Sequence, residues 1–122
     1  MQSGSIDIYN LALKSGSNLK GTDKTTIPRL LEVFESEVDV NNAVKLLIFY
    51  IYRQKERKEL RGEGVNDLLR SIKAIYERFR NDPDNLRDTV RKYLILVKWV
   101  YEFRLKKDKP VRSFEELLRE VQ

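Results

Sequence analysis

The chain has 122 residues, which suits one domain with one hydrophobic core. Charged residues make up 35% of it, with 24 Lys and Arg against 19 Asp and Glu, for a formal net charge of +5. Cysteine and histidine are absent, which excludes disulfides, thiolate nucleophiles and zinc–thiolate sites and removes the commonest general base.

The first 24 residues are predicted to form a short helix over residues 6–14 followed by a flexible linker. Ser5 is the expected N-cap of this helix, and Gly16 lies just beyond its end. The next segment, SGSNLKGTDK, is polar and has few apolar residues to offset the entropy of ordering it. We therefore expect residues 1–24 to lie apart from a helical bundle domain over residues 25–122.

Two helices are predicted next, over residues 25–37 and 40–60. The first has apolar residues at helical spacing, and Asp39 is the expected N-cap of the second. The second helix begins with the apolar stretch AVKLLIFYIY and ends with the charged stretch RQKERKEL. We expect this helix to leave the core, so that its last part is either a solvated helix end or an anion-binding surface.

The basic residues of this charged stretch form the first candidate site. Arg53, Arg57 and Arg61 are spaced at i, i+4 and i+8, so we expect them on one helix face with a rise of about 6 Å between neighbours. Lys55 and Lys58 are expected on another side of the helix.

A clearly amphipathic helix is predicted over residues 65–80, followed by the longest helix over about residues 83–107. Asp82 is the expected N-cap of the long helix, with Pro83 at its first position. Apolar residues cover roughly 240° of its circumference, so other elements must surround it or it also meets a partner. Charged residues interrupt it too often for a membrane span.

The fold predicted from these patterns is an all-α, single-domain bundle of five or six helices with a long central helix. No segment alternates with period two over more than a few residues. Ser113 and Glu116 form a capping-box pattern for a last short helix. The order of the helices in space stays open.

Positive charge is concentrated in the middle of the chain. Residues 1–40 have a net charge of −2, residues 41–112 of +9 and residues 113–122 of −2. This distribution favours a polyanionic partner. Candidate phosphate contacts therefore extend from the first site to the central helix, at Arg91, Lys92 and Lys98.

Aromatic residues accompany these cations and could stack on bases, but we expect most of them in the core. They are Phe49, Tyr50, Tyr52, Tyr93, Trp99, Tyr101 and Phe103.

Each catalytic template lacks parts, so we expect a protein that is not an enzyme and holds no cofactor or metal. The sequence has no nucleophile and base constellation and no phosphate-cradling glycine motif. Glu102 is the one acid inside the apolar part of the central helix, and we expect Lys98 to pair with it. No signal-peptide pattern is present, so a cytoplasmic protein is expected, and the composition is typical of thermophiles.

Three features, in order along the chain, resemble the small helical subunit of Csm-type (type III) CRISPR effector complexes. They are TTIPRLLEVFESE at 25–37, KLLIFYIYRQKERKE at 45–59, and the helix pair that runs from LLRSIKAIYERFRND to VRKYLILVKWVYEFR. The family pattern leads from a lysine-containing apolar segment to an arginine, a pattern that Lys45, Leu46, Leu47, Phe49 and Arg53 match.

One departure from the family pattern is that Tyr50, Ile51 and Tyr52 stand where the family tends to have alanines and glycine. The resemblance covers roughly residues 25–107.

The resemblance implies a non-enzymatic subunit that stacks beside the guide-RNA backbone subunits and holds the target strand with basic side chains, Arg53 among them. The expected partners are single-stranded RNA or the guide–target duplex backbone, other effector subunits and further copies of the chain. Two alternatives stay open: a helical dimerisation or scaffold protein, and an all-α DNA-binding factor.

Overall fold

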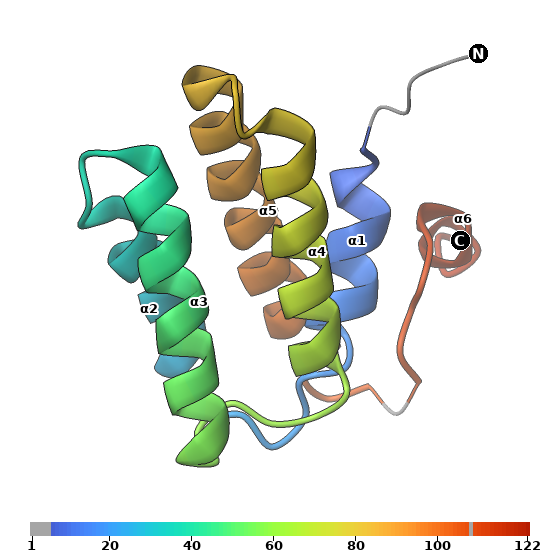
Figure 1. Ribbon diagram of the computed structural model, residues 1–122. Coiled ribbons are helices and arrows are strands. Elements are labelled where there is room, and N and C mark those ends of the chain that lie inside the picture. Colours follow the sequence, from blue (N-terminus) through green and yellow to red (C-terminus); the bar gives the residue numbers. More distant parts are fainter. Residues whose placement is uncertain (1–5, 108) are drawn as a thin grey trace.

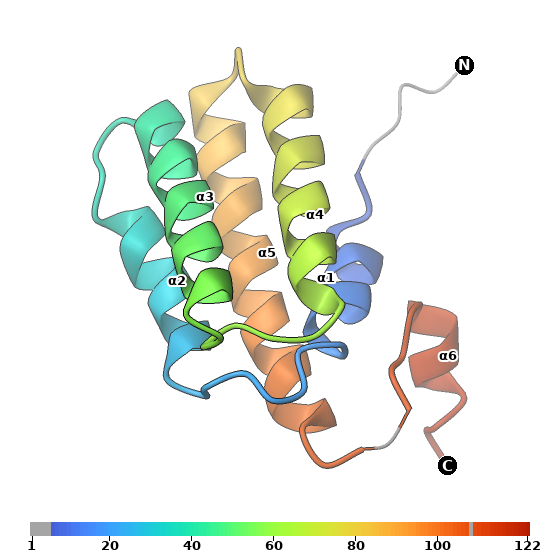
Figure 2. The same ribbon diagram turned by 60° about the horizontal axis from the view of Figure 1, so that its bottom comes forward.

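The computed structural model describes residues 6–107 and 109–122. Within these residues the chain forms six helices and no strand, which confirms the predicted all-α bundle. The helices are α1 (Ile8–Gly16), α2 (Thr26–Glu35), α3 (Val40–Glu56), α4 (Gly64–Phe79), α5 (Pro83–Arg104) and α6 (Phe114–Leu118). Helices α3 and α4 form one layer, and α2, α5 and α1 form the other, with α5 in the middle (Figure 1, Figure 2).

Most predicted helix starts are confirmed by hydrogen bonds to the capping side chain. The backbone N–H three residues further on donates to Asp39 at 3.0 Å, to Asp82 at 3.3 Å and to Ser113 at 3.2 Å. Helix α1 differs, because its N-cap is Asp7, which accepts from Tyr9 and Asn10. The predicted cap Ser5 lies outside the described residues.

Helix α1 belongs to the same core as the rest of the bundle, which corrects the predicted division at residue 24. It packs against α5 and α4, with Ile8 and Ala12 in the main hydrophobic cluster. The buried Ser15 Oγ lies 2.7 Å from the Tyr93 hydroxyl of α5 and donates to the carbonyl of Leu11 at 2.8 Å. The two hydroxyls thus share a buried hydrogen bond between α1 and α5, and burial raises the pKa of Tyr93.

The segment between α1 and α2, predicted to be a flexible linker, is packed against the bundle instead. Leu19 and Thr22 are only 1% and 7% exposed. The hydroxyl of Thr22 donates to the carbonyl of Arg61 at 3.0 Å and accepts from its N–H at 2.8 Å. One buried leucine and a set of long-range hydrogen bonds thus order a segment whose composition is otherwise polar.

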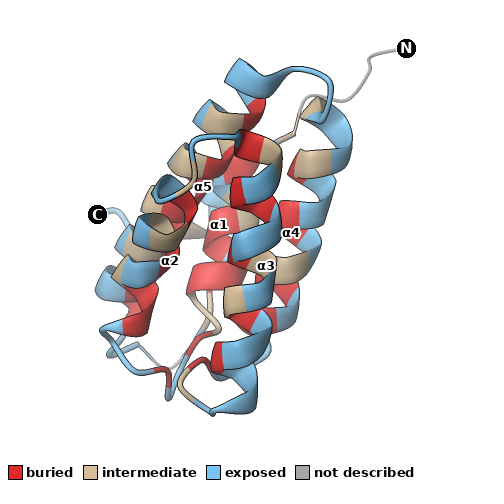
Figure 3. Ribbon diagram, turned by 60° about the vertical axis from the view of Figure 1, so that its left-hand side comes forward, coloured by how far each residue is buried: buried red, intermediate tan, exposed pale blue. Residues whose placement is uncertain are grey.

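Helix α5 is the predicted central helix, although it ends at Arg104 rather than near residue 107. Tyr93 and Val97 face the core and are fully buried. Trp99 and Phe103, which we expected in the core, are 54% and 47% exposed, and they line a shallow hollow with residues of α1 and α6. Figure 3 shows the same division on the other helices, where buried residues lie on the sides that face the interior.

The C-terminal helix α6 rests on α1 and is tied to the end of α5. The N–H of Phe114 donates to Asn10 Oδ1 at 2.8 Å. The guanidinium of Arg104, whose side chain is 5% exposed, donates to both carboxylate oxygens of Glu120 at 2.7 and 2.9 Å. None of the residues of α6 is buried, although Leu117 packs partly against a small cluster with Leu13 and Val111.

Candidate nucleic-acid interface

The candidate interface begins where α3 ends. Lys58 has a left-handed backbone conformation, with φ of 61°. The N–H of Lys58 donates to the carbonyl of Lys55 and the N–H of Glu59 to the carbonyl of Gln54, both at 3.0 Å. These two bonds are those of a Schellman motif, with a lysine in the position that glycine usually takes.

This motif corrects the prediction that three arginines share one helix face. Helix α3 stops at Glu56, so only Arg53 lies on it, while Arg57 and Arg61 lie in the turn that follows. The chain turns here because Leu60, which is 1% exposed, returns to the core. The burial of Leu60 thus fixes the direction in which the chain leaves the helix.

The turn at residues 57–63 is held against the segment at residues 17–25. Besides the paired bonds between Thr22 and Arg61, the N–H of Asp23 donates to the carbonyl of Glu59 at 2.9 Å. Gly62 has φ of +100°, and a Cβ there would lie 2.2 Å from the carbonyl oxygen of Asn18. The two segments therefore approach more closely than a residue with a side chain would allow.

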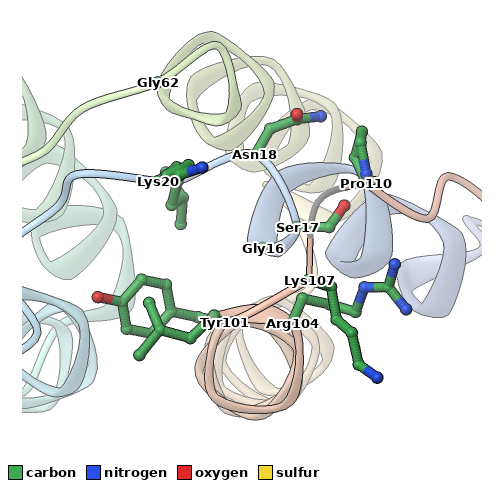
Figure 4. A pocket seen from close by; sticks show the side chains of 11 residues that line it. Gly16, Ser17, Asn18, Lys20, Gly62, Tyr101, Arg104, Lys107 and Pro110 are labelled. Atoms are coloured by element: carbon green, nitrogen blue, oxygen red, sulfur yellow. The ribbon is translucent and has the colours of Figure 1, made fainter.

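Cations from three separate parts of the sequence lie at one end of the bundle, which we call the basic end. A cavity of about 180 Å³ lies between the segment that follows α1, the turn at Gly62 and the end of α5 (Figure 4). Lys20 and Lys107 line it. We define the basic end by six exposed residues: Lys20, Lys24, Arg57, Lys58, Arg61 and Lys107.

Two acids near the basic end, Asp23 and Glu59, are engaged with other groups, whereas the exposed Glu56 and Glu63 make no salt bridge among the described residues. The backbone N–H and the hydroxyl of Thr25 donate to Asp23, each at 2.9 Å, and hold the pKa of Asp23 below its usual value. Glu59 accepts from Gln54 at 2.5 Å and pairs with Arg57 at 3.3 Å. Lys20, Lys24, Lys58 and Lys107 make no salt bridge among the described residues, so these cations are available to an anion.

The direction of the helices explains why cations are favourable at this end of the bundle. Helices α1, α3 and α5 all end at this side of the bundle (Figure 1). The partial negative charge at a helix C-terminus favours nearby cations by about 0.3–1 kcal/mol each. Of the six cations, Arg57 and Lys58 directly follow the end of α3 and gain from this effect, while they also present positive charge to the solvent.

The remaining predicted residues of α3 lie next to the basic end along that helix. Arg53 is exposed and donates to Gln54 Oε1 at 3.2 Å. Lys55 is exposed and its ammonium lies 3.5 Å from Asn66 Oδ1 of α4. Neither residue makes a salt bridge with another described residue, so both can extend the interface.

The predicted residues of α5 are not brought together with those of α3. Arg91 donates to Glu35 of α2 at 2.5 and 3.1 Å, and this hydrogen bonding lowers the pKa of Glu35. The ammonium of Lys92 lies 5.4 Å from the ring centre of Tyr9. The predicted pairing of Lys98 with Glu102 is confirmed, at 3.7 Å.

The topology of the bundle explains why Arg91 lies apart from Arg53. Helix α2 packs against both α3 and α5, and Arg91 of α5 bonds to Glu35 of α2. A surface that runs directly from Arg53 to Arg91 would have to cross α2. Lys98 of α5 lines a hollow with Lys24 of the basic end. Lys20, Lys24 and Lys107, which we had not considered as contacts, therefore join the candidate interface, and RNA contact by Arg91, Lys92 and Lys98 stays a prediction.

Aromatic residues of α3 are the other feature that differs from expectation. Phe49 and Tyr52 are 76% and 56% exposed, although we expected them in the core. Both lie on the side of α3 opposite Leu47 and Ile51, together with Lys45. The sequence contained a signal of this exposure, because at 100° per residue the charged Lys45 lies on the same helix face as the two rings. Of the other aromatic residues, Tyr93 and Tyr101 are buried as expected.

No metal-binding cluster emerges from the described residues. No group of three or more acidic side chains in the part of the chain that the structure describes could hold a metal ion. Among the same residues, no helix combines the length and apolar character needed to cross a membrane.

Comparisons with known proteins add no further evidence. The chain matches no protein-family model, no curated protein and no solved structure. The functional argument therefore rests on the sequence and on the geometry described above.

Proposed function

We propose that the protein is a non-catalytic RNA-binding subunit of a ribonucleoprotein complex. Its basic end, continued by Arg53 and Lys55, holds the backbone of a single strand or of a guide–target duplex. The resemblance to Csm-type small subunits supports a place in a type III CRISPR-like antiviral effector, where cleavage belongs to other subunits.

One observation carries this proposal: cations from three separate segments lie at one end of the bundle. The hydroxyl of Thr22 holds the first two segments together through hydrogen bonds to the backbone of Arg61, and Lys20 and Lys107, from the first and third segments, line one cavity. Phosphates are recognised by such clusters without regard to base sequence.

The experiment is a titration of the protein into labelled oligouridine, followed by fluorescence anisotropy at several salt concentrations. We expect the logarithm of the binding constant to fall linearly with the logarithm of the salt concentration, by about 0.7 for each phosphate contact. Duplex DNA of equal length should bind more weakly. A lack of RNA binding at low salt, or a preference for duplex DNA, would contradict the proposal.

A self-associating scaffold is the second candidate, and the exposed rings of Trp99 and Phe103 on α5 favour it. Light scattering with and without RNA separates the two functions. The scaffold forms a dimer that is indifferent to RNA, whereas the RNA-binding subunit changes its mass only when RNA is present.

A further inference from the structure

An apolar groove lies between α3 and α4, next to the basic end and separate from it. Its volume is about 490 Å³. The walls are formed by Val44, Ile48 and Phe49 of α3 and by Leu69, Ile72 and Tyr76 of α4. Tyr52 extends the α3 wall toward the end of that helix.

No described segment of the chain covers this groove. Phe49 is 76% exposed and also lines a second hollow, between α2 and α3, with Val33 and Leu46. An exposed aromatic ridge beside an apolar groove is typical of a surface that another molecule covers. The groove therefore has the character of a protein-binding site.

The shape of the groove favours a helix as its occupant. Both walls are helices whose backbone groups are already hydrogen-bonded, so they offer no edge to which a strand could add. From Val44 to Tyr52 the wall is about 12 Å long at 1.5 Å per residue. This length matches two to three turns of a helix with apolar residues at i, i+3, i+4 and i+7.

The charged residues at the rim of the groove indicate the charge of the partner. Lys45 stands on the α3 side, and Arg70 and Lys73 stand on the α4 side. Lys45 and Lys73 make no salt bridge among the described residues, while Arg70 lies 3.4 Å from Asp67. None of the residues that line the groove is acidic. A helix seated there would place its flanking residues beside cations on both sides.

We propose that the groove between α3 and α4 binds an acidic amphipathic helix of a protein partner. Its apolar face packs on the walls, and its Asp or Glu residues pair with Lys45, Arg70 and Lys73. A nucleic-acid strand fits less well, because seven of the ten lining residues are apolar or aromatic and phosphates would lie against them without hydrogen bonds.

The proposal is independent of RNA binding at the basic end, and its test uses different residues. The probe is a labelled synthetic peptide of about 14 residues, with Leu at i, i+3, i+4, i+7 and i+11 and Glu at the flanking positions. Two control peptides carry Lys in place of Glu or a scrambled order. We expect saturable binding of the acidic peptide and at least about tenfold weaker binding of both controls.

Two variants of the full chain link this binding to the groove. Phe49→Ala with Tyr52→Ala alters exposed side chains, so the fold should persist, and the peptide affinity should fall about tenfold or more. Lys45→Glu with Lys73→Glu should reverse the preference toward the Lys peptide. The Arg57→Ala, Lys58→Ala and Arg61→Ala variant, which alters the basic end, should keep its peptide affinity.

Three outcomes would overturn the proposal. Absence of saturable binding would do so, as would binding that the groove variants do not change. Loss of RNA affinity in the Phe49 and Tyr52 variant, without peptide binding by the parent chain, would assign the groove to nucleic acid. A dimer that the same variant abolishes, again without peptide binding, would assign it to a second copy of the chain.

Discussion

Replacing Arg57, Lys58 and Arg61 together by alanine is expected to lower the affinity for single-stranded RNA by about ten- to hundredfold at low salt. Each of these side chains is exposed at the basic end, so each can neutralise a phosphate and release a counterion. The dependence of the logarithm of affinity on the logarithm of salt concentration should become shallower by about 2, which corresponds to three lost contacts. Anisotropy titrations from about 50 to about 200 mM salt measure both effects.

The matched control removes three positive charges elsewhere, with Arg80→Ala, Arg112→Ala and Arg119→Ala. These residues are exposed, lie outside the basic end and make no salt bridge among the described residues. Both variants have the same net charge, so a general effect of charge would reduce RNA affinity equally in the two. Circular dichroism must first show that both variants are folded. Equal losses of RNA affinity in two folded variants would then refute a localised interface.

Gly62→Ala is expected to lower the free energy of unfolding by about 2–4 kcal/mol. The positive φ of Gly62 is unfavourable for alanine, and the new Cβ would lie 2.2 Å from the carbonyl oxygen of Asn18. The backbone of one of the two segments must shift, which separates the turn from the segment that contains Thr22. Urea denaturation measures the loss as a lower midpoint with an unchanged m-value.

Gly21→Ala provides the matched control for this substitution. Gly21 also has a positive φ, of +88°, but the nearest atom to an added Cβ is the flexible Arg61 side chain at 3.4 Å. We expect a loss of about 1–2 kcal/mol from the backbone conformation alone. If Gly62→Ala were no more destabilising than Gly21→Ala, the result would contradict the close approach of the turn to Asn18.

Helix positions could be predicted from the sequence because local signals determine them. Asp39, Asp82 and Ser113 cap helices through bonds to residues three positions further on, and such signals need no knowledge of the fold. The amphipathic pattern of α4 likewise depends only on its own residues. These elements form where we expected them, apart from small differences at their ends.

The parts that could not be predicted depend on contacts between distant segments. Helix α3 ends early because Leu60 returns to the core, and the segment around Thr22 is ordered because it bonds to Arg61, 39 residues away. The placement of Arg91 against Glu35 follows from how α2 and α5 pack. Each of these features decides which cations form the interface, so the candidate site was predicted only in its α3 part.

The most direct test of the account maps bound RNA onto the chain residue by residue. Amide chemical shifts of the isotope-labelled protein are recorded as a short oligouridine is added. We expect the largest changes at the basic end, around Lys20, Lys24, Arg57, Lys58 and Arg61, with smaller ones at Arg53 and Lys55. Changes confined to Arg91 and its surroundings on α5, or no changes at low salt, would contradict the account.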